Sequence, residues 1–103
     1  GFEWIDCHNW QDSVLAFVRR GSDPSDFLVV CCNFTPVPRH GYRLGMPAGG
    51  DYDEVFNSDS TYYGGGDIGN LSSLHAAAVP RHGRDHSVTL TLPPLAAVVL
   101  KPR

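Results

Sequence analysis

Apolar residues along this chain gather in short runs that are separated by turn-forming residues. The most apolar run covers residues 27–32, and residues 86–92 alternate strictly, with Val88, Leu90 and Leu92 on one face. Short runs that are rich in β-branched and aromatic residues are typical of strands. The polar residues of the alternating segment are expected to face solvent: Ser87, Thr89 and Thr91. The pattern predicts an all-β chain without a helix of useful length.

The runs and the breaks between them predict seven or eight strands. These are expected at residues 2–5, 13–20, 27–34, 42–44, 51–57, 74–79, 86–92 and 95–100. Short antiparallel strands in such a series are typical of a two-sheet sandwich with Greek-key connections. Charges on one face of residues 51–57 favour an edge strand, because charge at an edge discourages pairing with other molecules. Residues 57–73 are expected to form a long loop, and residues 81–85 a turn.

The expected strands at residues 13–20, 27–34 and 95–100 are apolar on both faces. In the first, Val14 and Ala16 lie on one side and Leu15 and Phe17 on the other. A half-buried strand should alternate with polar residues, so we expect both faces to be covered. One face would meet the second sheet. Two hypotheses remain open for the other face: a partner outside this chain, or the glycine-rich loop folding back over it.

Length and charge narrow the possible functions. A chain of 103 residues is long enough for one domain but not for two. Its net charge of −3 argues against nucleic acid as a partner. No apolar run approaches the roughly 20 residues that a membrane helix needs, so no membrane partner is expected. Because the chain begins at Gly1 and not at Met, we expect a piece of a longer protein.

The cysteines indicate the redox compartment. There are three, Cys7, Cys31 and Cys32, and an odd number is a poor disulfide framework. Cys31 and Cys32 are adjacent in an expected strand, so their side chains should point to opposite faces. Buried free thiols favour a reducing, cytoplasmic environment.

The residues do not predict catalysis, a cofactor or a metal site. Residues 64–69 match G-x-G-x-x-G by their letters, but no helical pattern follows, as a dinucleotide site requires. His82 and His86 lie four apart in a segment that is expected to be extended, so they are not predicted to share a metal. The acidic side chains of residues 51–54 lie on the expected edge strand, where charges are normally solvated.

Four segments, in order, carry a resemblance to a known family. Residues 33–47 read Asn-Phe-Thr-Pro-Val-Pro-Arg-His-Gly-Tyr-Arg-Leu-Gly-Met-Pro. The others are residues 1–5, residues 57–60 with 62–65, and residues 79–84 running into 87–96. Together they cover nearly the whole chain. They resemble the C-terminal β-domain of bacterial 1,4-α-glucan (glycogen) branching enzymes, which belong to the α-amylase superfamily.

The resemblance implies a single C-terminal accessory domain over residues 1–103, with the catalytic (β/α)8 barrel lying outside this chain. The parent enzyme would move α-1,4-glucan chains through a covalent glycosyl-enzyme to a 6-hydroxyl, forming α-1,6 branches in glycogen. The fragment itself is expected to be inactive and structural, packing on the barrel, and no catalytic residue carries over. A debranching or trehalose-forming member of the superfamily is the alternative parent, but residues 33–47 match branching enzymes more closely. Arg39, Arg43, Arg81 and Arg84 are expected to be surface or interface ion-pair partners.

Three aromatic residues are candidate glucan contacts: Trp10, Tyr62 and Tyr63. Sugar rings stack on Trp and Tyr, and these residues lie in a polar turn and beside the glycine-rich loop. The domain would then be a glucan-binding module. The alternative, which we favour, is that these rings anchor loops on the core or on a neighbouring domain, because aromatic side chains more often pack than bind.

Overall fold

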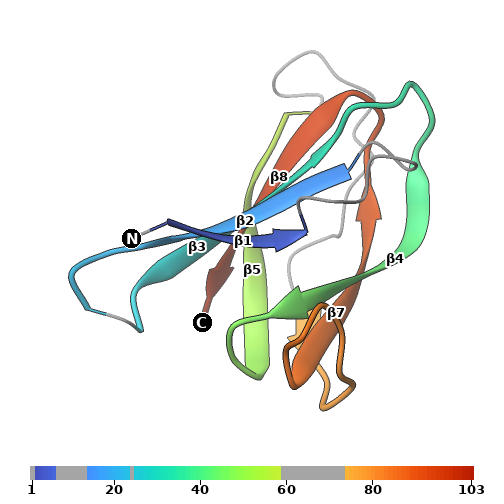
Figure 1. Ribbon diagram of the computed structural model, residues 1–103. Coiled ribbons are helices and arrows are strands. Elements are labelled where there is room, and N and C mark those ends of the chain that lie inside the picture. Colours follow the sequence, from blue (N-terminus) through green and yellow to red (C-terminus); the bar gives the residue numbers. More distant parts are fainter. Residues whose placement is uncertain (1, 7–13, 24, 59–73) are drawn as a thin grey trace.

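The computed structural model describes residues 2–6, 14–23, 25–58 and 74–103 (Figure 1). Its strands are β1 (Phe2–Asp6), β2 (Val14–Arg20), β3 (Phe27–Asn33), β4 (Arg39–Met46), β5 (Gly50–Asn57), β6 (Leu74–Ala76), β7 (His86–Leu92) and β8 (Ala96–Pro102). Within these ranges there is no helix, as the short apolar runs predicted. It follows that no described helix has the length and apolarity needed to cross a membrane.

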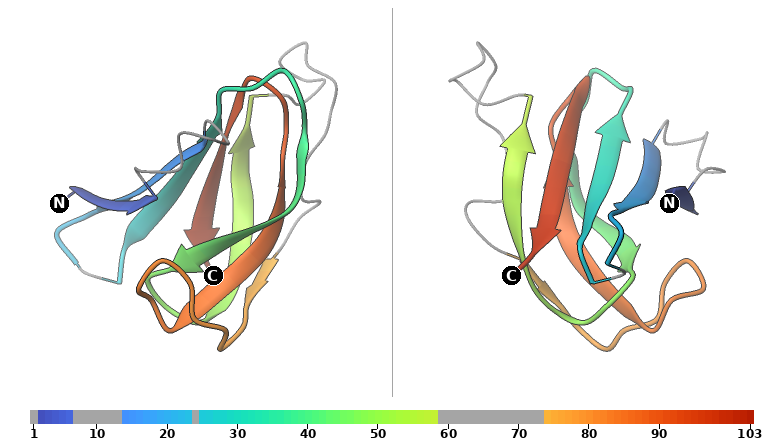
Figure 2. Two further views of the ribbon diagram at one scale, coloured as in Figure 1. Left: turned by 45° about the vertical axis from the view of Figure 1, so that its right-hand side comes forward. Right: turned by 90° about the vertical axis from the view of Figure 1, so that its left-hand side faces the viewer.

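The strands form two antiparallel sheets, which confirms the expected all-β sandwich. The larger sheet has the order β1-β2-β3-β8-β5-β6, and the smaller sheet pairs β4 with β7. Figure 2 shows β4 and β7 crossing one face of the larger sheet. The chain therefore changes sheet after β3, β4, β6 and β7, and its last strand, β8, lies inside the larger sheet between β3 and β5.

The core lies between the two sheets. The larger sheet contributes Val18, Val29 and Leu100, which are fully buried, and the smaller sheet contributes Leu44 and Leu92. The largest fully buried side chain is that of Tyr52. Its hydroxyl donates a hydrogen bond of 2.8 Å to the carbonyl oxygen of Ala48, so the ring is buried without leaving its polar atom unpaired. Burial raises the pKa of the Tyr52 hydroxyl above its ordinary value.

Two sequence-based expectations about strands need correction. β5 pairs with β6 over Gly50–Tyr52 and with β8 over Tyr52–Asn57, so it lies inside the larger sheet and an edge strand was the wrong expectation. Beyond Tyr52, no described strand other than β8 pairs with it. The strand expected at residues 74–79 ends at Ala76, after which Ala77 pairs with Ser87 as an isolated bridge.

Ser87 is buried rather than exposed, although Val88, Leu90 and Leu92 do face the core as expected. Its backbone exchanges two hydrogen bonds with Ala77, and its hydroxyl accepts one of 2.8 Å from Nη1 of Arg43. The alternation along β7 correctly predicts that Ser87 lies on the face opposite to Val88. It cannot predict that another segment of the same chain covers this part of the outer face.

The turn expected near residues 81–85 is present. Arg81 and Arg84 exchange backbone hydrogen bonds, and both His82 and Gly83 have positive φ angles (54° and 73°). This turn packs directly on β4: a Cβ atom on Gly45 would lie 2.2 Å from the carbonyl oxygen of Arg81. The Gly45 N–H donates a hydrogen bond of 3.0 Å to Nδ1 of His82. Glycine is therefore required here by the close approach of two backbones.

Candidate functional site

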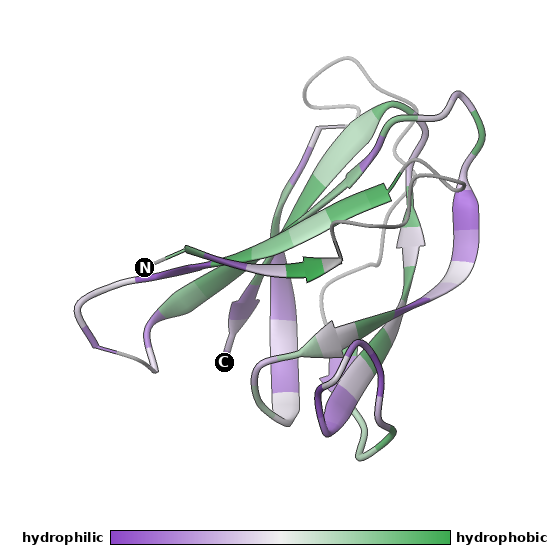
Figure 3. Ribbon diagram, in the orientation of Figure 1, coloured by the Kyte–Doolittle hydropathy of each residue, from purple (hydrophilic) through white to green (hydrophobic). Residues whose placement is uncertain are grey.

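The outer face of the larger sheet, which points away from the core, carries a continuous row of apolar side chains. Register places Trp4 opposite Phe17, Phe17 opposite Val30, Val30 opposite Val99, and Val99 opposite Phe56. Directly paired residues share one face of a sheet. We call these five residues the outer row: Trp4, Phe17, Val30, Val99 and Phe56. Figure 3 shows β2 and much of β8 as apolar, in contrast to the mixed colouring of β4 and β7.

Aromatic rings gather at the β1 end of the outer row. The Phe2 ring lies 4.9 Å from that of Trp4, edge to face, and 4.9 Å from that of Phe17, stacked. Such pairs contribute about 0.5–1.5 kcal/mol each beyond the area they bury. Nevertheless Phe2 and Trp4 stay 48% and 47% exposed. The cluster is thus packed within itself, and its outer side is uncovered by the described residues.

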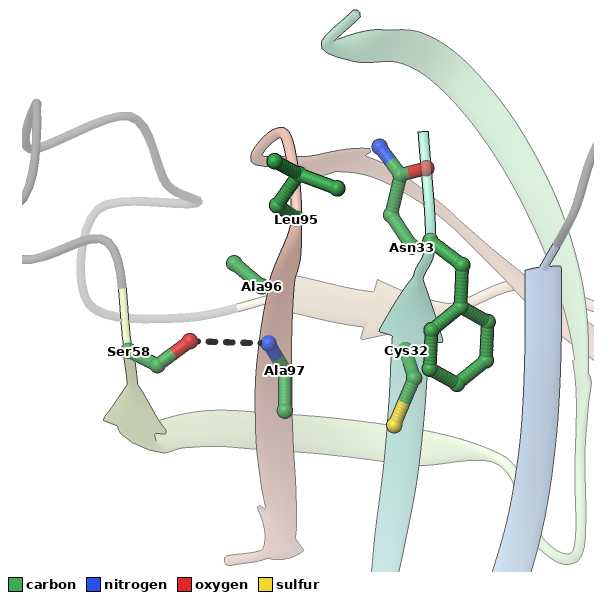
Figure 4. A pocket seen from close by; sticks show the side chains of 7 residues that line it. Cys32, Asn33, Ser58, Leu95, Ala96 and Ala97 are labelled. Carbon is green, nitrogen blue, oxygen red and sulfur yellow. Dashed lines mark hydrogen bonds between the residues drawn. The ribbon is translucent and has the colours of Figure 1, made fainter. Parts of the chain in front are cut away.

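An open pocket of about 330 Å³ lies beside the outer row, at the end of β3 and the start of β8 (Figure 4). Its lining is mostly apolar and comprises Cys32, Asn33, Phe34, Ser58, Leu95, Ala96 and Ala97. Cys32 and Ala97 are paired in register, directly next to the pair Val30 and Val99. The pocket and the outer row therefore form one continuous surface. Its volume is at the small end of the range for ligand pockets, about 300–1,000 Å³.

The two thiols of β3 lie as the sequence predicted. Cys31 is buried in the core, Cys32 is half-buried on the outer face, and neither forms a disulfide bond. Burial raises the pKa of the Cys32 thiol above its ordinary value. This thiol is consequently a weak nucleophile at neutral pH, and a structural side chain fits its surroundings better than a catalytic one.

Asn33 ties the two sheets together at the pocket end of the sandwich. It is buried, and its Nδ2 donates hydrogen bonds of 3.0 Å to the carbonyl oxygens of Val37 and Pro93. Its Oδ1 accepts hydrogen bonds from the backbone N–H and the hydroxyl of Thr35, at 3.0 and 2.7 Å. One amide thus satisfies groups in both connections that cross between the sheets here. The sequence-based reasoning did not single out Asn33, although an Asn followed two residues later by Thr at the end of an apolar run was the available signal.

The charged side chains that the sequence singled out form exposed pairs. Oδ1 of Asp51 lies 2.7 Å from Nδ1 of His75, and Oδ1 of Asp53 accepts a hydrogen bond of 3.0 Å from Nε of Arg103. The hydrogen bond and charge of Asp53 raise the pKa of Arg103. In the described ranges, no three His, Cys, Asp or Glu side chains gather so as to hold a metal ion. Asp51 and Asp53 of β5 thus take part in surface ion pairs.

Glu3 of β1 bridges the two sheets from the surface. It pairs with Arg84 in the turn that packs on β4, and Nη2 of Arg20 lies 3.7 Å from its Oε2. The hydrogen bond from Arg84 is the main cause that lowers the pKa of the Glu3 carboxyl. Arg84 is therefore an ion-pair partner, as expected, whereas the Arg43 guanidinium donates a hydrogen bond to a hydroxyl, that of Ser87.

Comparison with known families decides what kind of domain this is. The family model for the alpha amylase C-terminal all-beta domain matches residues 4–103. The chain belongs to this family. The match takes in β1 from Trp4 onwards and the seven other described strands, so the outer row and the adjoining pocket are features of an alpha amylase C-terminal all-beta domain.

The similar proteins are much longer than this alpha amylase C-terminal domain. A 1,4-alpha-glucan branching enzyme of Thiobacillus denitrificans is 57% identical over 99% of this chain, which covers 14% of that protein. Its counterpart in Burkholderia thailandensis is 54% identical over 96% of the chain and 12% of the protein. That of Aquifex aeolicus is 48% identical over 98% of the chain and 16% of the protein. The chain thus spans roughly one seventh of these relatives.

The candidate glucan contacts of the alpha amylase C-terminal domain are not placed by the structure. Trp10, Tyr62 and Tyr63 lie outside the described residues, as do residues 64–69 with their G-x-G-x-x-G letters. What the structure does bring together is the outer row, which the sequence indicated only as three separate strands that are apolar on both faces. The pairing of β8 with β3 joins these strands into one apolar surface, and its pairing with β5 extends that surface to Phe56.

Proposed function

We propose that this chain is the C-terminal accessory domain of a bacterial 1,4-α-glucan branching enzyme that acts in glycogen synthesis in the cytoplasm. The observation that carries the proposal is the match of nearly the whole chain to branching enzymes, at up to 57% identity in the comparisons above. The role of the domain is structural: it packs on the catalytic (β/α)8 barrel of the same protein and stabilises it. The free thiols of β3 are consistent with a reducing cytoplasm.

The test compares three proteins: the full-length enzyme, the enzyme without residues 1–103, and residues 1–103 alone. Branching activity on amylose and the melting temperature are measured for each. We expect the isolated domain to be inactive and the truncated enzyme to melt at a lower temperature than the full-length enzyme. A truncated enzyme with unchanged stability and activity would overturn the accessory role. The parent's reaction is tested separately, because full-length enzyme that forms no α-1,6 bonds would exclude a branching enzyme.

A second candidate function is a glucan-binding module that uses Trp10, Tyr62 and Tyr63. Aromatic side chains beside a glycine-rich segment favour it, since sugar rings stack on such rings. Titration with maltoheptaose, followed by NMR of the tryptophan indoles, tests this function. Binding that is weakened by Trp10→Ala, Tyr62→Ala or Tyr63→Ala, and not by the control Trp4→Ala, would support it. Indole chemical shifts that do not change at millimolar sugar would leave the structural role as the remaining candidate.

A further inference from the structure

We propose that the outer row and the adjoining pocket are the surface on which this domain receives the preceding, catalytic part of its own protein. This inference rests on the proposed function and adds the face that makes the contact. The sandwich has two outward sheet faces and, among the residues that the structure describes, only the face of the larger sheet is apolar across several strands. A contiguous exposed apolar patch of this kind marks an interaction site.

The position at which the chain enters the domain indicates which segment covers this apolar surface. The family is a C-terminal domain, and its relatives here are six to eight times as long as this chain, so most of such a protein precedes β1. β1 is an edge strand of the larger sheet, and its Phe2 and Trp4 side chains lie on the outer face. The incoming chain therefore reaches the domain beside the apolar surface. A segment tethered at that point has a high effective concentration there, so even a modest contact area is sufficient.

Charge is arranged around this surface as at a protein interface. Arg19 lies opposite Phe2 and Leu28 on the outer face, with its guanidinium carbon 6.0 Å from the centre of the Phe2 ring. Lys101 lies opposite Asp53 at the other side. Between these polar positions the outer row is wholly apolar. An apolar centre with a polar rim is typical of interfaces whose centre is desolvated.

The pocket supplies a place for an anchoring side chain. Its rim includes Leu95, which is 69% exposed and has a positive φ of 49°. The Leu95 N–H donates a hydrogen bond of 2.8 Å to the carbonyl oxygen of Thr35, which holds this residue at the rim. A buried aliphatic or aromatic anchor in such a pocket commonly carries much of an interface's energy. We assign the pocket to one apolar side chain of the catalytic part.

Cys32 provides a direct probe, because it lines the pocket and is half-buried without a partner domain. Trypsin releases residues 21–39 as one peptide, which holds Cys31 and Cys32 but not Cys7. The experiment labels the isolated domain and the full-length enzyme with N-ethylmaleimide at mildly alkaline pH and follows this peptide by mass spectrometry. A Cys32→Ser variant identifies the labelled thiol, since Cys31 is fully buried. We expect Cys32 to react at least about tenfold more slowly in the full-length enzyme, as for a site exposed only by rare opening.

Three other outcomes would overturn the inference. Equally slow labelling in both proteins would mean that this chain covers its own surface, residues 57–73 being the segment in question. Slow labelling of the isolated domain that rises on dilution would mean that a second copy is the occupant. Equally fast labelling in both would mean that the surface stays open. If residues 1–103 still stabilise the full-length enzyme in that last case, the accessory role stands and only the assigned face is wrong.

A matched pair of variants makes the test independent of Cys32. Leu28 lies on the outer face beside Arg19 and is 37% exposed, whereas Val79 is 41% exposed and lies after β6, away from that face. In the isolated domain, Leu28→Asp and Val79→Asp should shift the melting temperature alike. In the full-length enzyme, Leu28→Asp should raise the labelling rate of Cys32 at least about fivefold, since a charge in a desolvated contact is costly. Equal effects of the two variants in the full-length enzyme would contradict the assignment.

Discussion

The two sheets of this domain differ in the face that each turns away from the core. On the smaller sheet, that face carries Arg43 opposite Thr89, and the Arg43 side chain donates a hydrogen bond to Ser87. On the larger sheet, it carries Phe17 opposite Val30 and Val30 opposite Val99. Both sheets bury their inner faces equally well. The difference teaches how to interpret the two sequence patterns. Alternating apolar and polar residues indicate a sheet with one face toward solvent, whereas a strand that is apolar on both faces indicates a second contact surface.

At the Gly45 end, a turn of this chain covers the outer face of the smaller sheet. The turn at residues 81–84 packs so closely on Gly45 that a Cβ atom there would meet the backbone of Arg81. Gly45→Ala should therefore force the turn away from β4 and break the hydrogen bond to His82. We expect it to lower the free energy of unfolding by about 3 kcal/mol, the upper range for overpacking. Urea unfolding of the isolated domain measures this change.

Gly41→Ala is the control for Gly45→Ala. Gly41 has a φ of 67° and open space around its Cβ position, so alanine there meets only backbone strain. That strain costs about 1 kcal/mol. If Gly45→Ala destabilised the domain no more than Gly41→Ala, the packed turn would not be what closes the smaller sheet.

At the pocket end, hydrogen bonds of the buried Asn33 side chain link the two connections between the sheets. Asn33→Ala removes a donor from the carbonyl oxygens of Val37 and Pro93; the Val37 oxygen keeps the Thr35 hydroxyl as a donor, but the buried Pro93 oxygen loses its bond. We expect a loss of about 2 kcal/mol in the free energy of unfolding, since unsatisfied buried groups cost roughly 1–3 kcal/mol. Chemical denaturation of the variant beside Thr35→Val provides the check. Thr35→Val deletes a hydroxyl that lies within hydrogen-bond distance of Asn33 Oδ1 and of the Val37 carbonyl oxygen, and it should cost about half as much. Equal losses would show that Asn33 does not link the two connections.

A matched pair of Val→Thr variants tests the difference between the faces directly. Val88 faces the core from β7, and a hydroxyl buried there without a partner should cost about 1.5 kcal/mol. Val30 lies on the outer row and is half-buried, so Val30→Thr should cost less than about 0.5 kcal/mol in the isolated domain. Thermal unfolding followed by circular dichroism would measure both. A large cost for Val30→Thr in the isolated domain would mean that this face is already covered by the domain itself.

The smallest effect is expected from the ion pair that joins β1 to the turn on the smaller sheet. The pKa of Glu3 is lowered in the folded protein, chiefly by the hydrogen bond from Arg84, so the charged carboxylate stabilises the fold. This contribution is complete above about pH 4.3, the ordinary pKa of glutamate, and is lost as the pH falls through the lower folded value. Because the side chain is exposed to screening solvent, the contribution should stay below about 1 kcal/mol.

The measurement for Glu3 compares the wild-type domain with Glu3→Gln by urea unfolding across the acid range. The two curves of unfolding free energy against pH should differ at neutral pH and converge at acid pH, where Glu3 is protonated in both states. A difference that persisted unchanged at pH 2 would assign the effect to packing of the longer side chain and not to the charge.

The strands could be predicted from local patterns, because the alternation of apolar and polar residues and the position of turn residues depend on nearby sequence. Residues 86–92 show both the strength and the limit of such patterns: Val88, Leu90 and Leu92 face the core, but Ser87 is buried too, where its backbone bridges to Ala77 and its hydroxyl accepts a hydrogen bond from Arg43. The outer row could not be predicted, since its Val99 and Phe56 join Phe17 only through pairings with β8. The hydrogen bonds of Asn33 could not be predicted either, because their acceptors, the Val37 and Pro93 carbonyl oxygens, come from two separate connections.

The position of β8 has a consequence for how this domain is made. Its partners are far away in sequence: Val99 lies opposite Val30, which is 69 residues upstream. A loop of this length must close before β8 can pair with β3 in the middle of the larger sheet. The entropy cost of that closure slows folding. Until β8 is in place, β1-β2-β3 and β5-β6 are two separate fragments, each with an open edge. A truncation of the last eight residues should therefore split the sheet in the middle, while a cut of equal length at a terminal edge strand would only shorten it.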